Sequence, residues 1–193
     1  MPYVSSHNDI GKDLILRNCL GDKPHIELNS CMGVDVQLNE LWVAIGTEAG
    51  VFALAQLPET EEKSKWERLG ELMEVYDVRY CVIDGGFTPN EVIAFANKYP
   101  GRVWINWYKD DPKKAKIVRF SDDEFHAKER KTFVEEITVL TERDRMIDYI
   151  LDDLKKGVVR FFYYPESDGI KKLIAHTGTT YARIVKARIS LRS

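Results

Sequence analysis

The fold is decided by residues 32–57, which read MGVDVQLNELWVAIGTEAGVFALAQL. Three apolar runs lie in this stretch, at Met32–Gln37, Leu41–Gly46 and Val51–Leu57, and short polar segments separate them. Short apolar runs joined by tight turns are typical of neighbouring antiparallel strands. The sequence therefore predicts a meander of three strands.

The chain downstream of the meander alternates between helical and extended patterns. Apolar residues recur at helical spacing in residues 61–76, 88–99 and 142–156, which predicts three amphipathic helices. Residues 80–84 form a short apolar run, as in a strand buried on both faces, and residues 102–108 predict a further strand. A meander followed by alternating helices and strands predicts an α/β fold, the ribonuclease H-like mixed sheet with helices on both faces.

The second half of the chain contains less regular segments. Residues 109–142 are highly charged and predict an inserted β-hairpin or long loop, with strands at 116–120 and 136–140. A strand is predicted at 158–164, followed by a short helix at 168–176.

The length of 193 residues allows one domain with a sizeable core. Residues 1–30 contain frequent breakers of regular structure, so we predict an irregular linker there and the domain itself at 31–193. No apolar run approaches the roughly 18 residues of a membrane helix. The first residues also lack the pattern of a secretory signal, so we expect a cytoplasmic protein with no membrane partner.

Charge is distributed unevenly along the chain, although the net charge is only −3. Residues 1–100 carry 8 basic and 16 acidic side chains, whereas residues 101–193 carry 20 and 15. An acidic half suits a cation site and a basic half suits a polyanion, but a solvated surface explains the same composition. The three cysteines are widely spaced and form no C-x-x-C pair, which argues against a disulfide framework or a zinc site.

Asp35 lies in the middle of the first predicted strand, in the sequence GVDVQ. Strand alternation places Gly33, Asp35 and Gln37 on one face. A carboxylate in an apolar strand is costly to bury unless something compensates its charge. A metal ion would do so, and a hydrogen bond or a Lys or Arg partner is the alternative.

Asp84 closes the strand at 80–84 and is followed by Gly85 and Gly86, which would let a phosphate backbone approach closely. A turn aspartate before glycine is the alternative. In a ribonuclease H-like sheet the first strand is central and the fourth lies beside it, so Asp35 and Asp84 should be neighbours. Two close carboxylates repel unless a cation lies between them, and Mg²⁺ or Mn²⁺ suits oxygen ligands. Two such ions would activate a water and stabilise the leaving oxygen of a phosphodiester.

These motifs resemble those of viral large terminases. MGVDVQ at 32–37, followed by LWVAI at 41–45, resembles their first two nuclease strands, and VIDGG at 82–86 resembles their second acidic motif. The order of elements from Gly33 to Tyr164 is also similar, including the charged insertion.

The resemblance implies a metal-dependent endonuclease that cuts double-stranded viral DNA during genome packaging, by a two-metal mechanism with low sequence specificity. It implies Asp35 and Asp84 as the catalytic metal ligands. It also implies an upstream ATPase domain, a portal and a small terminase as partners, in the cytoplasm of the infected host cell.

The sequence departs from that family in two respects. It contains no G-x-x-x-x-G-K-[ST] phosphate loop. The family also has a third acid on a C-terminal helix, but no acid follows Asp168, so that helix would be missing and Asp168 is a possible substitute. A helix cap is the alternative role for Asp168. His176 shows no metal-ligand spacing and is interpreted as a surface residue, with DNA contact as the alternative.

DNA is expected to meet the site through basic side chains that contact phosphates without reading sequence. The candidates are Lys109, Lys113, Lys114, Lys116, Lys171, Lys172, Arg183, Lys186 and Arg188. A solvated charged loop is the alternative for those on the insertion. Two other functions stay open: a non-catalytic DNA-binding or docking module on the same fold, and another ribonuclease H-like nuclease, such as a resolvase or exonuclease.

Overall fold

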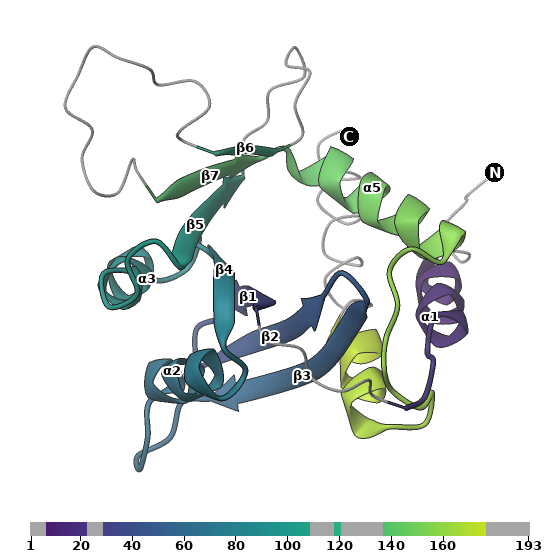
Figure 1. Ribbon diagram of the computed structural model, residues 1–193, viewed down its shortest axis with the longest axis horizontal. Helices are drawn as coiled ribbons and strands as arrows, with labels where there is room; N and C mark the ends of the chain where they lie inside the picture. The colour runs from purple at the N-terminus through teal and green to yellow at the C-terminus, as the bar shows by residue number, and fades with distance from the viewer. Residues whose placement is uncertain (1–6, 23–28, 109–117, 121–136, 177–193) are drawn as a thin grey trace, which may run out of the picture.

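The computed structural model describes residues 7–22, 29–108, 118–120 and 137–176, which form one mixed sheet with helices (Figure 1). The strands are β1 (Ser30–Val36), β2 (Glu40–Thr47), β3 (Gly50–Pro58), β4 (Val78–Asp84), β5 (Val103–Tyr108), β6 (Val118–Phe120) and β7 (Thr138–Thr141). The helices are α1 (His7–Arg17), α2 (Lys65–Val75), α3 (Pro89–Ala96), α5 (Arg143–Lys156) and an unlabelled helix at 168–176.

The sheet has the order β3-β2-β1-β4-β5-β7-β6. Strands β1, β2 and β3 form the predicted antiparallel meander, and β1 pairs in parallel with β4 on its other side. Strand β4 pairs in parallel with β5, which pairs in parallel with β7. The first strand is therefore central and the fourth lies beside it, as the sequence predicts.

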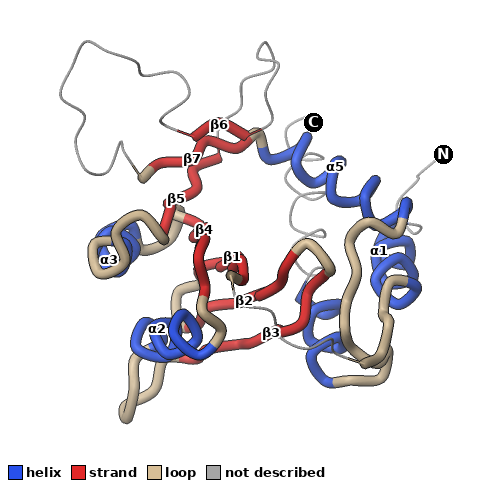
Figure 2. The backbone as a smooth tube through the Cα atoms, viewed as in Figure 1, coloured by secondary structure: helices blue, strands red, loops and turns tan. Residues whose placement is uncertain are grey.

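One face of the sheet carries the main core. Val34 and Val36 of β1 are buried there with Leu69 of α2 and Phe95 of α3. Because side chains alternate along a strand, Asp35 lies on the opposite face. Helices α2 and α3 lie on one side of the sheet, and α1, α5 and the 168–176 helix lie on the other (Figure 2).

The helix termini follow from local capping. Ser64 and Glu67 form a capping box, so α2 begins at Lys65, somewhat later than periodicity alone predicts. Gly157 ends α5 with a left-handed φ of 71°, which a residue without a Cβ adopts at little cost. The helix predicted at 168–176 is confirmed.

The N-terminal segment differs from its prediction, because α1 occupies residues that we expected to be irregular. Leu14 and Ile15 are buried in a second, smaller core with Leu154 of α5. Asn18 Nδ2 donates to Leu14 O at 2.7 Å and to Leu154 O at 2.8 Å, which ties the end of α1 to α5. Tertiary packing thus stabilises a helix that local propensity disfavours.

The strand predicted at 158–164 is also wrong. Only isolated bridges form, from Phe161 to Cys19 and to Val51 of β3. The segment passes between the end of α1 and the edge of β3. Its backbone shares three hydrogen bonds with residues 18–21 and two with Val51, which form one isolated bridge on each side and no extended ladder.

The charged insertion is described only at its strands. Strand β6 and strand β7 pair antiparallel, close to the two predicted strands. Residues 109–117 and 121–136 lie outside the described residues. Within the described part of the chain, no helix has the length and apolarity that a membrane crossing requires.

Candidate functional site

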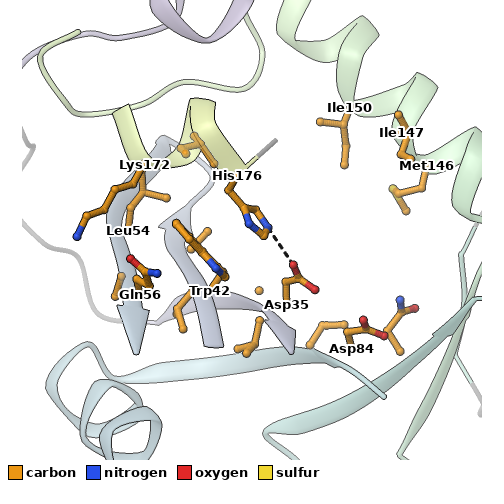
Figure 3. Close-up of a pocket in the computed structure, with 18 of the residues that line it drawn as sticks. Asp35, Trp42, Leu54, Gln56, Asp84, Met146, Ile147, Ile150, Lys172 and His176 are labelled. Carbon is orange, nitrogen blue, oxygen red and sulfur yellow. Dashed lines mark hydrogen bonds and ion pairs between the residues drawn. The ribbon is translucent and has the colours of Figure 1, made fainter. Parts of the chain in front are cut away.

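Asp35 and Asp84 lie side by side on adjacent strands. Val34 and Ile83 are the last residues that pair between β1 and β4, and the two aspartates follow them directly. Val34 and Ile83 are buried on the core face, so both aspartates project from the other face. Both line a cavity of about 740 Å³ between the sheet, α5 and the 168–176 helix (Figure 3).

The two carboxylates belong to a row of polar and aromatic side chains across five strands. Asp35 is opposite Trp42, and Trp42 is opposite Gln56. On the other side, Asp84 is opposite Asn106 of β5. All five residues line the cavity, so strand register alone positions the floor of the site.

Asp35 is held by two side chains. Gln37 Nε2 donates to Asp35 Oδ2 at 3.0 Å, and His176 Nε2 lies 2.9 Å from the same oxygen. The ring of His176 also stacks on Trp42, with centroids 4.4 Å apart and an interplanar angle of 22°. The contact joins the end of the 168–176 helix to the central strand, and sequence reasoning missed it because no motif or spacing marks His176.

Asp84 begins a tight turn after β4. Gly86 N donates to Asp84 Oδ1 at 3.1 Å. Gly85 is buried, and a Cβ there would lie 2.8 Å from Ile105 Cγ2 and 2.9 Å from the ring of Trp107. We expected both glycines to give a phosphate backbone room, but Gly85 is small because the turn packs on β5. A Cβ at Gly33, in contrast, would meet nothing within 4 Å.

Asn106 extends the polar floor beyond Asp84. Its side chain is buried, and Thr141 Oγ1 of β7 donates to Asn106 Oδ1 at 2.5 Å. This bond fixes the amide of Asn106 next to the acidic pair. A buried amide in this position adds a further polar group to the cavity without adding charge.

The wall opposite the sheet is largely apolar. Met146, Ile147 and Ile150 of α5 face the cavity (Figure 3). Leu173 of the 168–176 helix also lines it. Ile150 is 44 % exposed although it lies on the apolar face of α5. The side of the cavity formed by the sheet is therefore charged and polar, and the opposite side is largely apolar.

Asp168 lines the same cavity but does not join the acidic pair. Its side chain is 90 % exposed, and Lys171 Nζ lies 3.6 Å from its Oδ1. Asp168 stands in the first turn of its helix, where a carboxylate is favourable. Among the described residues, no group of three or more His, Cys, Asp or Glu side chains is arranged to hold a metal ion.

The predicted basic contacts are only partly within the described residues. Lys171 and Lys172 are exposed, and Lys172 lines the cavity. The others lie outside the described residues: Lys109, Lys113, Lys114, Lys116, Arg183, Lys186 and Arg188.

The donor set suits a hard divalent cation. Asp35 and Asp84 supply carboxylate oxygens near the carboxyl ends of two adjacent central strands. Mg²⁺ keeps several waters and is commonly held by one or two carboxylates together with substrate phosphates. Two adjacent carboxylates on a cavity floor thus meet the minimum that such an ion needs.

The sheet order and the helices on both faces define a ribonuclease H-like α/β fold. Among solved structures, the gp2c part of the large terminase subunit from bacteriophage Sf6, a mutant with calcium, matches with a TM-score of 0.54 and 10 % identity. The match covers 85 % of this chain and 78 % of that chain, and at this identity it shows a common fold.

A second structure, Pelota from Archaeoglobus fulgidus, matches 42 % of this chain with 14 % identity and a TM-score of 0.33. This chain spans 27 % of Pelota, and the likeness is too weak to carry an argument. Neither a protein-family model nor a curated protein sequence matches the chain.

Proposed function

We propose that the chain is a metal-dependent endonuclease that hydrolyses phosphodiester bonds of double-stranded viral DNA during genome packaging. One observation carries the proposal: Asp35 and Asp84 follow the last paired residues of adjacent parallel strands and line one cavity. The terminase-like fold and the short terminase-like motifs support the same function.

The chain's own groups would bind and orient the reactants. Asp35 and Asp84 would hold divalent ions, Mg²⁺ or Mn²⁺, through their carboxylate oxygens. When bound, such ions activate the attacking water and offset the charge that develops on the leaving oxygen. Gln37 keeps the Asp35 carboxylate in one orientation. The open space above Gly33 leaves room beside Asp35 for a DNA phosphate.

DNA would be held without sequence readout. Lys172 stands at the cavity, and the basic residues predicted on the insertion and near the end of the chain would add phosphate contacts. In the same proposal, the domain, with α1 packed against α5, acts with an upstream ATPase domain, a portal and a small terminase in the cytoplasm of the infected host cell.

Plasmid nicking tests this function. The wild-type chain should nick covalently closed plasmid when Mg²⁺ or Mn²⁺ is present and lose the activity when a chelator removes the ion. Asp84→Asn, which keeps the shape but removes the charge, should abolish nicking. Asp148→Asn on the exposed part of α5 is the matched control and should retain it. Full activity of Asp84→Asn would reject the proposal.

A second candidate is a non-catalytic DNA-binding or docking module. It is favoured by one observation: in the described part of the chain, no third carboxylate joins Asp35 and Asp84. Calorimetry with Mn²⁺ separates the two functions. DNA binding with neither heat from Mn²⁺ nor cleavage would favour the module.

A further inference from the structure

A histidine stands beside Asp35, at a site where no third acid joins Asp35 and Asp84 among the described residues. His176 lies at the end of the described part of the 168–176 helix, and its Nε2 is 2.9 Å from Asp35 Oδ2. The side chain of His176 is 21 % exposed and that of Asp35 is 39 % exposed. Both side chains are partly exposed, and both line the cavity (Figure 3).

The distance between the two atoms fits two arrangements. A nitrogen and an oxygen 2.9 Å apart can share a proton in a hydrogen bond. They can also share a metal ion, because ligands at right angles on an octahedral ion with bonds of about 2.1 Å lie about 3.0 Å apart. Histidine is the commonest metal-binding side chain, so the second arrangement is chemically ordinary.

The ring of His176 is positioned by a stacking contact. It stacks on Trp42, which stands opposite Asp35 in the β1–β2 register. Trp42 Nε1 in turn donates to Glu40 Oε1 at 2.7 Å, and Gln56 Nε2 donates to Glu40 Oε2 at 2.6 Å. A ring positioned by a chain of packed and bonded neighbours is preorganised to present Nε2 toward Asp35.

We propose that His176 is a ligand of the divalent ion that Asp35 holds and supplies nitrogen where, among the described residues, no third carboxylate joins Asp35 and Asp84. This inference rests on the proposed nuclease function and adds a named residue to its metal site. Imidazole suits transition-metal ions better than it suits Mg²⁺. The wild-type site should therefore prefer Mn²⁺ over Mg²⁺ more strongly than a variant whose third ligand is oxygen.

The alternative role for His176 is a positioning residue that only hydrogen-bonds Asp35. In that case its nitrogen stays outside the coordination sphere of the ion. Activity alone does not separate the two roles, because loss of a metal ligand and loss of a hydrogen bond to Asp35 would both impair the site. A direct spectroscopic measurement of nitrogen on the ion does separate them.

Pulsed electron paramagnetic resonance of Mn²⁺ bound to the full chain makes this measurement. We expect a nitrogen coupling of the size that a directly bound imidazole gives. Histidine labelled with ¹⁵N should change the coupling to that of ¹⁵N, and this readout needs no substitution. His176→Gln should abolish the coupling and weaken Mn²⁺ binding by about tenfold or more, the scale of losses at metal sites. Asp148→Asn, on the exposed part of α5 and outside the cavity lining, is the matched control and should keep it.

The oxygen-donor variant gives an independent readout. His176→Asp should bind Mn²⁺ without nitrogen coupling, and its ratio of Mn²⁺ to Mg²⁺ affinity should fall by about tenfold from the wild-type ratio. An unchanged ratio, or a coupling that survives in His176→Gln, would overturn the ligand role.

Failure of the inference is distinguishable from failure of the proposed function. Mn²⁺ binding that is lost in Asp84→Asn but shows no nitrogen coupling in the wild type overturns the role of His176 and leaves the metal-dependent nuclease standing. The absence of any Mn²⁺ binding to the wild-type chain overturns both.

Discussion

His176 stacks on Trp42 with ring centroids 4.4 Å apart, so the end of the described chain closes onto the meander that begins the sheet. The two residues come from the 168–176 helix and from β2, which are far apart in sequence. Their contact positions the imidazole against Asp35 on the central strand. The site thus combines strand register on its floor with one helix that packs over it.

Removing the indole should loosen this arrangement. Trp42→Leu should weaken Mn²⁺ binding by about twofold to tenfold, which corresponds to the roughly 0.5–1.5 kcal/mol of an aromatic pair. Trp42→Phe keeps an aromatic face and should stay near the wild-type affinity. Calorimetry measures both, with thermal unfolding as a check that each variant folds. Equal affinity of Trp42→Leu and wild type would show that the stacking does not position His176.

The turn after Asp84 should tolerate no side chain at Gly85. Gly85→Ala would place a Cβ 2.8 Å from Ile105 Cγ2, so we expect a loss of about 1–3 kcal/mol in the free energy of unfolding. Gly33→Ala meets nothing within 4 Å and is the matched control, with little expected loss. Urea unfolding measures both variants. Equal stability of the two would contradict the close packing of the turn on β5.

Helix α1 should contribute to the stability of the domain. Leu14 is 2 % exposed in the second core, so Leu14→Ala should lower the free energy of unfolding by about 2–5 kcal/mol. Lys12→Ala on the exposed side of the same helix is the control. If residues 1–30 were only a linker, urea unfolding of Leu14→Ala would match the wild type.

The three cysteines should differ in reactivity. Cys31 is exposed, whereas Cys81 is buried and desolvation raises its pKa well above the ordinary value of a thiol. Desolvation also raises the pKa of Cys19, and the nearby Glu166 raises it further. A raised pKa leaves less thiolate at pH 8, and the thiolate is the nucleophile. Iodoacetamide should modify Cys31 first and Cys81 only after unfolding in urea. Mass spectrometry of the peptides reads this order, and rapid native labelling of Cys81 would contradict it.

The acidic pair could be predicted because the order of elements along the chain indicates a ribonuclease H-like sheet, in which the fourth strand lies beside the first. The structure has this strand order, and β1 and β4 pair up to Val34 and Ile83, so Asp35 and Asp84 are neighbours. The fold class followed from the same pattern and is confirmed.

The rest of the site depends on contacts between segments distant in sequence. His176 carries no local signal, and only the packing of its helix over β1 and β2 brings it to Asp35. Helix α1 has breakers in its sequence but buries Leu14 against α5. The segment at 158–164 has a strand-like composition, but its neighbours on both sides offer only single bridges.

The central claim is that Asp35 and Asp84 hold one divalent site together, and calorimetric titration of the full chain with Mn²⁺ tests it most directly. We expect saturable binding to the wild type, loss of that binding in both Asp35→Asn and Asp84→Asn, and wild-type binding by the surface control Asp148→Asn. Wild-type affinity in either site variant, or equal weakening in the control, would contradict the account.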